Sequence, residues 1–89
     1  MEWTIVFSRH AKKDLEKIKA NKSLKRKVCE LFEIIEKNPY QNPPRYEKLQ
    51  GDLEGKFSRR INIQHRLVYE VDEQEKQVKV LSVWTHYEF

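Results

Sequence analysis

Three arginines on two short predicted strands are the residues of this sequence whose types and spacing first suggest chemistry. Apolar and polar residues alternate over 56–62 and again over 66–71, which predicts two strands, each with one apolar face. Arg60 and Arg66 fall on the faces turned away from the apolar residues, so they would stand together on the non-core side. Two guanidinium groups held there match the paired oxygens of a phosphate. Arginine on surface strands also serves solubility and edge protection, and the strands alone leave both interpretations open.

The third arginine and three groups outside these strands complete the set of candidates. Arg59 falls on the apolar face of its strand, where a charged side chain must lie near a strand end, extend to solvent or be paired. Glu47 lies upstream in the segment 39–55, which holds all three prolines and both glycines of the chain. Long irregular connections inside a compact domain are uncommon and often functional. His86 and Tyr87 close the chain with an imidazole and a phenol, although terminal tails are usually chemically silent.

Two helices are expected between an opening strand over 2–7 and the segment that holds Glu47. Ser8 is a suitable N-cap for a helix over about 9–20. The buried stripe of that helix consists of apolar residues at helical spacing: Ala11, Leu15 and Ile18. Ser23 is expected to cap a second helix that ends near residue 38, and the short connection between the two helices predicts an antiparallel hairpin.

The remaining elements are strands. A short strand or turn is expected around 46–49, and a solvated hairpin connection over 72–77 separates the second arginine strand from a last strand over about 78–84. Because the last strand is apolar on both faces, it is expected to be buried on both sides or central. The fold class is therefore α+β: a two-helix hairpin packed on one face of a small, mainly antiparallel, twisted sheet in the order β-α-α-β-β-β.

Composition limits the classes of function. The chain has 89 residues and is expected to form a single domain, 1–89, too small for a large enclosed active site. It carries 18 Lys and Arg against 14 Asp and Glu, a net charge of +4, which favours nucleic acid or another acidic partner. An open sheet face suits unpaired nucleotides, so RNA is favoured over duplex DNA. Cys29 is the single cysteine, and no apolar run has the length of a signal or a membrane span, which together favour a cytoplasmic protein.

Several motifs resemble the YoeB/Txe toxins of bacterial toxin–antitoxin pairs, within the RelE-like ribonuclease superfamily. The segments that carry the resemblance are EKL at 47–49, LEG at 53–55, FSRRI at 57–61, HRLVY at 65–69 and the closing HY at 86–87. The similarity covers essentially the whole chain and the expected element order. It implies the RelE-like microbial ribonuclease fold and a ribosome-dependent endoribonuclease, an enzyme that cuts mRNA in the decoding site and is inhibited by a cognate antitoxin.

The resemblance also implies roles for individual residues. Glu47 corresponds to the general base of the family, Arg66 to its phosphate-binding arginine and His86 to its general acid. Four further residues are expected to assist at the phosphate or to hold RNA: Arg60, Tyr87, Arg59 and Lys48. Cleavage of RNA by such a set needs no metal or cofactor, because a base, an acid and cations that hold the charge of the phosphorane suffice. The expected products are a 2′,3′-cyclic phosphate, or the 3′-phosphate derived from it, and a 5′-hydroxyl.

Two positions depart from the family pattern. The family commonly has a lysine after the leucine of its Glu-x-Leu segment, whereas this chain has Gln50, which leaves open whether Lys48 substitutes. The family often ends on the tyrosine, whereas Glu88 and Phe89 follow it here.

Two other functions compete with the nuclease. Gyrase-directed toxins share the fold but lack the set of acid, arginine and histidine, so the presence of Glu47 and His86 argues against them. A non-catalytic module that docks on ribosomal RNA and blocks decoding would use the same basic face. The expected partners are the antitoxin, covering Arg60, Arg66 and the C-terminus, together with the ribosome and mRNA. Operator DNA would be bound through the antitoxin complex alone, no membrane is involved, and the apolar face of the second helix permits a homodimer without requiring one.

Overall fold

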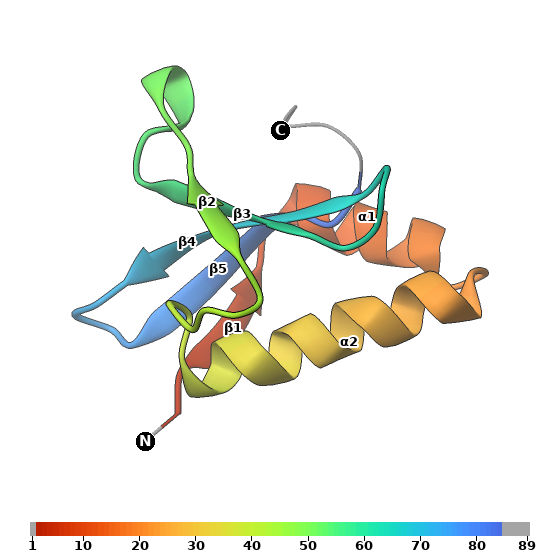
Figure 1. Cartoon of the computed structure of the whole chain (residues 1–89), viewed down its shortest axis with the longest axis horizontal. Helices are drawn as coiled ribbons and strands as arrows, with labels where there is room; N and C mark the ends of the chain where they lie inside the picture. Colours follow the sequence, from red (N-terminus) through yellow and green to blue (C-terminus); the bar gives the residue numbers. More distant parts are fainter. Residues whose placement is uncertain (1, 85–89) are drawn as a thin grey trace.

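The computed structural model of the chain describes residues 2–84, which form two helices and a five-stranded sheet (Figure 1). In chain order the elements are β1 (Thr4–Phe7), α1 (Arg9–Ile18), α2 (Lys22–Lys37), β2 (Tyr46–Lys48), a 3-10 turn η1 (Gly51–Leu53), β3 (Lys56–Arg60), β4 (Arg66–Asp72) and β5 (Gln77–Ser82). The strand order is β1-β5-β4-β3-β2, in which β1 runs parallel to β5 and all other neighbours are antiparallel. The expected α+β architecture is confirmed, and the short strand expected near residue 46 forms the edge strand β2.

The two helix starts show one correct and one wrong prediction from the sequence. The Ser8 side chain accepts a hydrogen bond of 3.0 Å from the backbone N–H of Ala11, as expected for the cap of α1. The cap of α2 is Asn21 instead of Ser23: its side-chain oxygen accepts from the N–H of Leu24 at 3.0 Å, and its own backbone is extended. Asparagine caps as well as serine does, and Ser23 lies inside the first turn.

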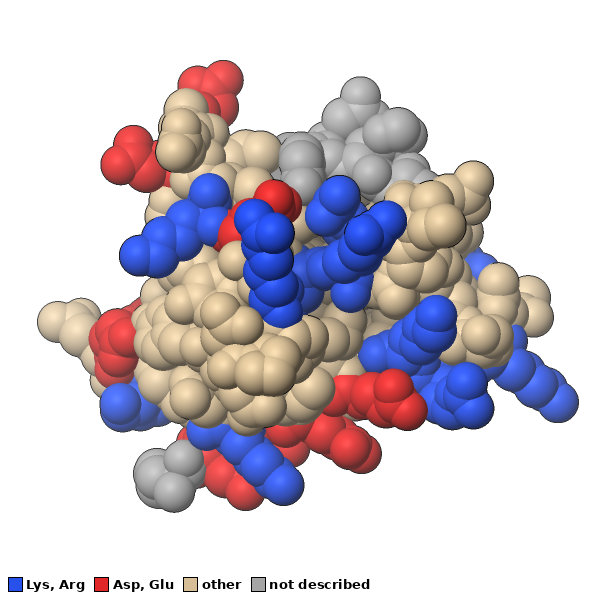
Figure 2. Space-filling view, in the orientation of Figure 1, with Lys and Arg blue, Asp and Glu red and all other residues tan. Residues whose placement is uncertain are grey.

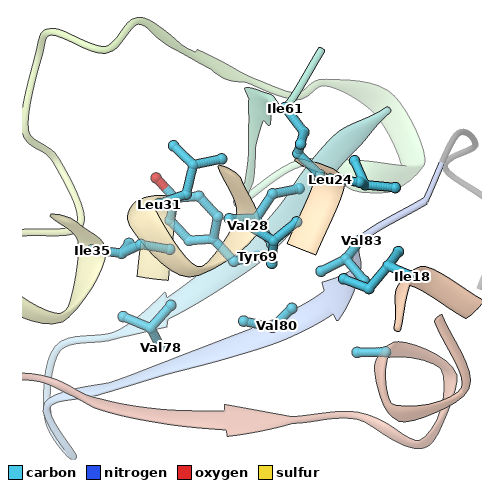
Figure 3. Packing of buried hydrophobic residues seen from close by; sticks show 12 residues of the cluster. Ile18, Leu24, Val28, Leu31, Ile35, Ile61, Tyr69, Val78, Val80 and Val83 are labelled. Atoms are coloured by element: carbon cyan, nitrogen blue, oxygen red, sulfur yellow. The ribbon is translucent and has the colours of Figure 1, made fainter. Parts of the chain in front are cut away.

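The core lies between the helices and one face of the sheet. Figure 3 shows apolar side chains of α2 facing those of β4 and β5. The buried residues of α2 are Leu24, Val28, Leu31 and Ile35, and their partners on the sheet include Leu67, Tyr69, Val78 and Val80. The strand β5 lies between β1 and β4, which confirms the expectation that the last strand is central. Within the described residues, neither helix is long and apolar enough to cross a membrane.

The buried face of α1 contains a carboxylate that the helical pattern did not reveal. Asp14 is 1% exposed, and one of its oxygens accepts from the hydroxyl of Ser82 and from the backbone N–H of Val83, each at 3.1 Å. His10 approaches the same carboxylate at 3.5 Å and Lys17 at 3.8 Å. Asp14 therefore ties α1 to the end of β5, the strand that leads to the C-terminus.

Candidate functional site

The candidate site lies on the open face of the sheet, opposite the helices. Cross-strand register places Glu47 of β2 opposite Ser58 of β3, and Arg60 of β3 opposite Arg66 at the start of β4. Ser58 and Arg60 are two residues apart on one strand, so all four side chains share one face. The prediction that Arg60 and Arg66 stand together on the non-core side is confirmed, and β2 adds the carboxylate to them.

These side chains line an open depression of about 340 Å³. Its lining residues are Pro44, Arg45, Glu47, Ser58, Arg60 and Arg66. Figure 2 shows Lys and Arg side chains grouped around acidic atoms in the upper middle of the view. Pattern reasoning missed three of the lining residues, Pro44, Arg45 and Ser58. Ser58 could have been found, because it has the same strand parity as Arg60, whereas the place of Arg45 depends on the path of the irregular segment before β2.

Glu47 and Arg66, which both line the depression, form a loose pair. An Oε oxygen of Glu47 lies 3.8 Å from an Nη nitrogen of Arg66, beyond hydrogen-bond distance. The side chains are 50% and 38% exposed, respectively, so water screens their attraction and both can turn toward a ligand at little cost. Arg60 is exposed, and its Nε donates a bond of 3.3 Å to the carbonyl oxygen of Asn62.

The position of Arg60 directly opposite Arg66 indicates a site for an anion. Like charges directly opposite each other on neighbouring strands are destabilising. An anion bound between the two guanidinium groups would remove that repulsion and supply acceptors for their planar donors. The arrangement can therefore hold a phosphate, with the Glu47 carboxylate beside it as a proton acceptor.

Arg59 has a different role from the one expected. The side chain is fully buried, and its guanidinium donates to the carbonyl oxygens of Pro39 at 3.0 Å, Gln41 at 2.9 Å and Pro44 at 2.6 Å, and to the hydroxyl of Tyr69 at 2.9 Å. These bonds use the donors that a phosphate would need, which corrects the expectation that Arg59 binds RNA. The sequence left three options for a charged side chain on the apolar face: a place near a strand end, extension to solvent, or pairing. Arg59 is paired, and its main partners are carbonyl oxygens. Arg59 fixes the Pro-rich segment that leads into β2, and so helps to position the strand that carries Glu47.

Tyr69 belongs to this buried group and to the core. Its hydroxyl donates to the carbonyl oxygen of Pro39 at 2.8 Å while it accepts from Arg59. Burial raises the pKa of Tyr69 above its ordinary value, and the adjacent Arg59 opposes that effect. The hydroxyl therefore remains protonated at neutral pH and serves packing and hydrogen bonding instead of proton transfer.

Three candidates remain: Lys48, which the structure places outside the depression, and His86 and Tyr87, which it does not describe. Lys48 does not line the depression around Glu47; among the described residues it lines a neighbouring depression with Gln50. His86 and Tyr87 lie outside the described residues, so the roles assigned to them stay predictions.

Two side chains near Arg66 make structural contacts. His65 places Nδ1 2.9 Å from the side-chain oxygen of Asn62, a structural contact at the start of β4. Glu70 has the same strand parity as Arg66 but pairs with Lys56 at 3.6 Å, its direct neighbour across the β3–β4 pair.

A family model, curated relatives and solved structures are similar to this chain over most of its length. The model of the YoeB-like toxins of bacterial type II toxin–antitoxin systems matches residues 7–87. Toxin YoeB of Mycobacterium bovis is 37% identical over 68 residues, which cover 76% of this chain and 78% of that protein. The YoeB–YefM complex from Staphylococcus aureus contains a similar chain with a TM-score of 0.81 and 36% identity, covering 98% of this chain and 100% of that one, and a YoeB dimer from that organism matches equally well. The YoeB/ParE toxin from Agrobacterium tumefaciens has a TM-score of 0.86 at 27% identity, covering 94% and 99% of the two chains.

Proposed function

The chain belongs to the YoeB-like toxin family of bacterial type II toxin–antitoxin systems, and from this we propose that it is a ribosome-dependent endoribonuclease that cleaves mRNA in the decoding site. One observation carries the proposal: the carboxylate of Glu47 lies 3.8 Å from the guanidinium of Arg66, in a depression that Arg60 also lines. A base beside two phosphate-binding cations is what cleavage of RNA through its own 2′-hydroxyl requires.

In the proposed reaction, Glu47 takes the proton of a ribose 2′-hydroxyl. The 2′-oxygen then bonds to the adjacent phosphorus, and the bond from phosphorus to the 5′-oxygen of the next nucleotide breaks. Arg66 and Arg60 stabilise the charge that gathers on the non-bridging oxygens. His86, assigned by family resemblance, gives its proton to the departing 5′-oxygen. The products are a 2′,3′-cyclic phosphate and a 5′-hydroxyl.

The openness of the depression supports dependence on the ribosome. Glu47 and Arg66 are both substantially exposed in the isolated chain, so water weakens every interaction they could make with a substrate. Docking in the decoding site would exclude that water and hold the message against the two groups. Electrostatic stabilisation of a transition state is stronger in such a water-excluded site.

Primer extension on a translated message in a purified translation system tests the proposal. Wild type should produce cuts inside codons that require ribosomes. Glu47→Gln should cut about 10²–10⁴-fold more slowly, the usual loss for one proton-transfer group, and His86→Ala should lose a similar factor. Glu70→Gln is the matched control, because it removes a carboxylate that pairs with Lys56 outside the depression. It should cut at the wild-type rate.

The same translation reactions, together with a DNA supercoiling assay, distinguish the nuclease from a ribosome-binding inhibitor and from a gyrase-directed toxin. Arrest of translation with an intact message, unchanged in Glu47→Gln, would contradict the nuclease and identify a non-catalytic ribosome-binding inhibitor. Loss of DNA supercoiling with translation unaffected in the purified system would instead identify a gyrase-directed toxin.

We also propose that a cognate antitoxin inhibits the chain by covering Arg60, Arg66 and the C-terminus. The support is the open, cationic character of the depression, which would attract an acidic segment, together with the antitoxin complex known for the Staphylococcus aureus relative. Operator DNA would be reached through that complex. A saturated toxin–antitoxin mixture should show no cleavage, and persistent cleavage would refute this mode of inhibition.

A further inference from the structure

A second depression shares Arg60 with the first and involves none of the residues assigned so far to proton transfer. It has a volume of about 770 Å³. Its lining residues are Lys27 from α2 together with Arg60, Ile61, Asn62, Ile63 and Gln64 from the end of β3 and the turn that follows. Because Arg60 lines both depressions, a strand of RNA that places a phosphate at Arg60 and Arg66 can continue directly into the second one.

The turn that forms this depression keeps a large apolar side chain in water. Ile63 is 84% exposed. Hydrogen bonds close the turn: the side-chain oxygen of Asn62 accepts from the backbone N–H groups of Gln64 at 2.9 Å and His65 at 2.7 Å, and the N–H of Ile61 donates to the carbonyl oxygen of His65 at 2.8 Å. Ile63 is therefore presented by an ordered turn, beside a cation from α2 and a cation from β3.

We propose that this depression binds the nucleotide next to the scissile phosphate in single-stranded RNA. Lys27 and Arg60 would contact backbone phosphates, Ile63 would pack against the base, and the exposed amide of Gln64 would face the edge of the base. Unstacked bases of single strands are recognised in this way, by an apolar or aromatic surface beside polar groups that reach the base edge. The proposal rests on the proposed ribonuclease function and extends its binding site.

The positive charge of the second depression, and its connection to the first through Arg60, favour RNA over a protein segment as its ligand. Among the described residues that line the second depression, two are cationic and none is acidic. The depression is wide and open, as a site for one nucleotide of a continuing strand must be. The shared residue Arg60 connects the depression to the site where the phosphate would react.

The test uses the full chain and compares Ile63→Ser and Lys27→Gln with Lys25→Gln. Lys25 is an exposed lysine of the same helix that lines the groove between the helices instead. Single-turnover cleavage is measured on ribosomes programmed with messages that differ in the nucleotide flanking the cut. Ile63→Ser should lower the apparent second-order rate about fivefold to tenfold, consistent with the loss of one base contact, and should flatten the preference for the flanking nucleotide. Lys25→Gln should match wild type.

A second readout separates this proposal from the nuclease itself. Binding of a short single-stranded RNA is followed by fluorescence anisotropy in the Glu47→Gln background, over a range of salt. Lys27→Gln should reduce the slope of log K against log[salt] by about 0.7, the value for one phosphate contact on a single strand, whereas Ile63→Ser should weaken binding with the slope unchanged.

The outcomes are distinct. If wild type cleaves and both variants cleave and bind RNA as it does, the second depression is not an RNA site although the nuclease stands. If wild type does not cleave but the two variants still weaken RNA binding, the depression binds RNA and the nuclease fails. If Ile63→Ser leaves RNA binding intact and weakens the complex with an antitoxin, the surface binds protein and the proposal is overturned. Thermal unfolding of each variant should match wild type, because the altered side chains are on the surface.

Discussion

Replacing Arg59 with lysine keeps the positive charge and most of the side-chain length but removes the planar fork of donors. In the structure that fork makes four hydrogen bonds, three to carbonyl oxygens of the Pro-rich segment before β2 and one to the hydroxyl of Tyr69. The acceptors surround a flat group, so a single ammonium nitrogen would reach about two of them. The carbonyl oxygen of Pro39 would keep the Tyr69 hydroxyl as a donor, whereas any other acceptor that lysine cannot reach would lose its charged donor.

The expected loss of stability follows from these bonds. Hydrogen bonds to charged groups contribute about 1.5–3 kcal/mol each, so losing two should lower the free energy of unfolding by about 3–6 kcal/mol. A chain of this length has a total free energy of unfolding of about 4–13 kcal/mol, so the change is a large part of the whole. Each kcal/mol moves Tm by about 4–8 °C in a domain of this size, which predicts a decrease of at least about 12 °C.

Urea unfolding followed by circular dichroism, together with thermal melting, measures the effect. Arg60→Lys is the matched control, because it makes the same substitution one residue along the strand on an exposed side chain, where changes are usually within about 0.5 kcal/mol. The two variants should show opposite profiles: Arg59→Lys loses stability, whereas Arg60→Lys keeps stability and weakens cleavage. If Arg59→Lys were as stable as wild type and defective in RNA binding, the structural role of the four Arg59 hydrogen bonds would be refuted. The phosphate-binding role first expected for Arg59 would then be supported.

Further predictions concern two groups outside the candidate site. Asp14→Asn removes the charge from the carboxylate that accepts from Ser82, and should lower the free energy of unfolding by about 1–3 kcal/mol in urea titrations, because a buried charge-assisted bond is weakened. Burial and a hydrogen bond to Glu73 raise the pKa of Tyr40 to about 12. Its folded pKa therefore exceeds its unfolded one, so the stability it contributes is complete below about pH 10 and is lost as pH rises through about 12. The free energy of unfolding of wild type should fall more steeply over that interval than that of Tyr40→Phe.

Each of these predictions has its own control. Glu16→Gln changes an acid on the same helix as Asp14 whose pair with Lys19 is exposed on both sides, and stability should be unchanged. An equal loss in Glu16→Gln and Asp14→Asn would show that the helix charge matters instead of the buried contact. Parallel pH curves for wild type and Tyr40→Phe would contradict the role given to the Tyr40–Glu73 bond.

Local pattern predicted much of the fold and half of the site. Strand alternation is a property of neighbouring residues, so it placed Arg60 and Arg66 on one face before any pairing was known. The cap at Ser8 could be identified in the same way. The position of Glu47 beside Arg66 depends on the register of β2 against β3, which is non-local, and it was anticipated through family resemblance alone.

The features that pattern could not predict are buried polar groups with distant partners. The parity of Arg59 showed that it needed partners, but the carbonyl oxygens that it meets belong to an irregular segment 15–20 residues away. Asp14 looked like an ordinary polar residue of a helix, because the Ser82 hydroxyl that it binds is 68 residues away. Choosing Ser23 over Asn21 as a cap was a local error between two suitable residues.

The central claim is that the Glu47–Arg66 site cleaves RNA through the attack of its own 2′-hydroxyl. The most direct measurement uses a message with a single 2′-deoxy nucleotide placed on the 5′ side of the cut that wild type makes on the ribosome. The account predicts that cleavage at that bond is abolished, that neighbouring bonds and ribosome binding are unaffected, and that the all-ribose message yields a 2′,3′-cyclic phosphate and a 5′-hydroxyl. Cleavage of the deoxy-substituted bond at the wild-type rate, or a product with a 5′-phosphate, would contradict it.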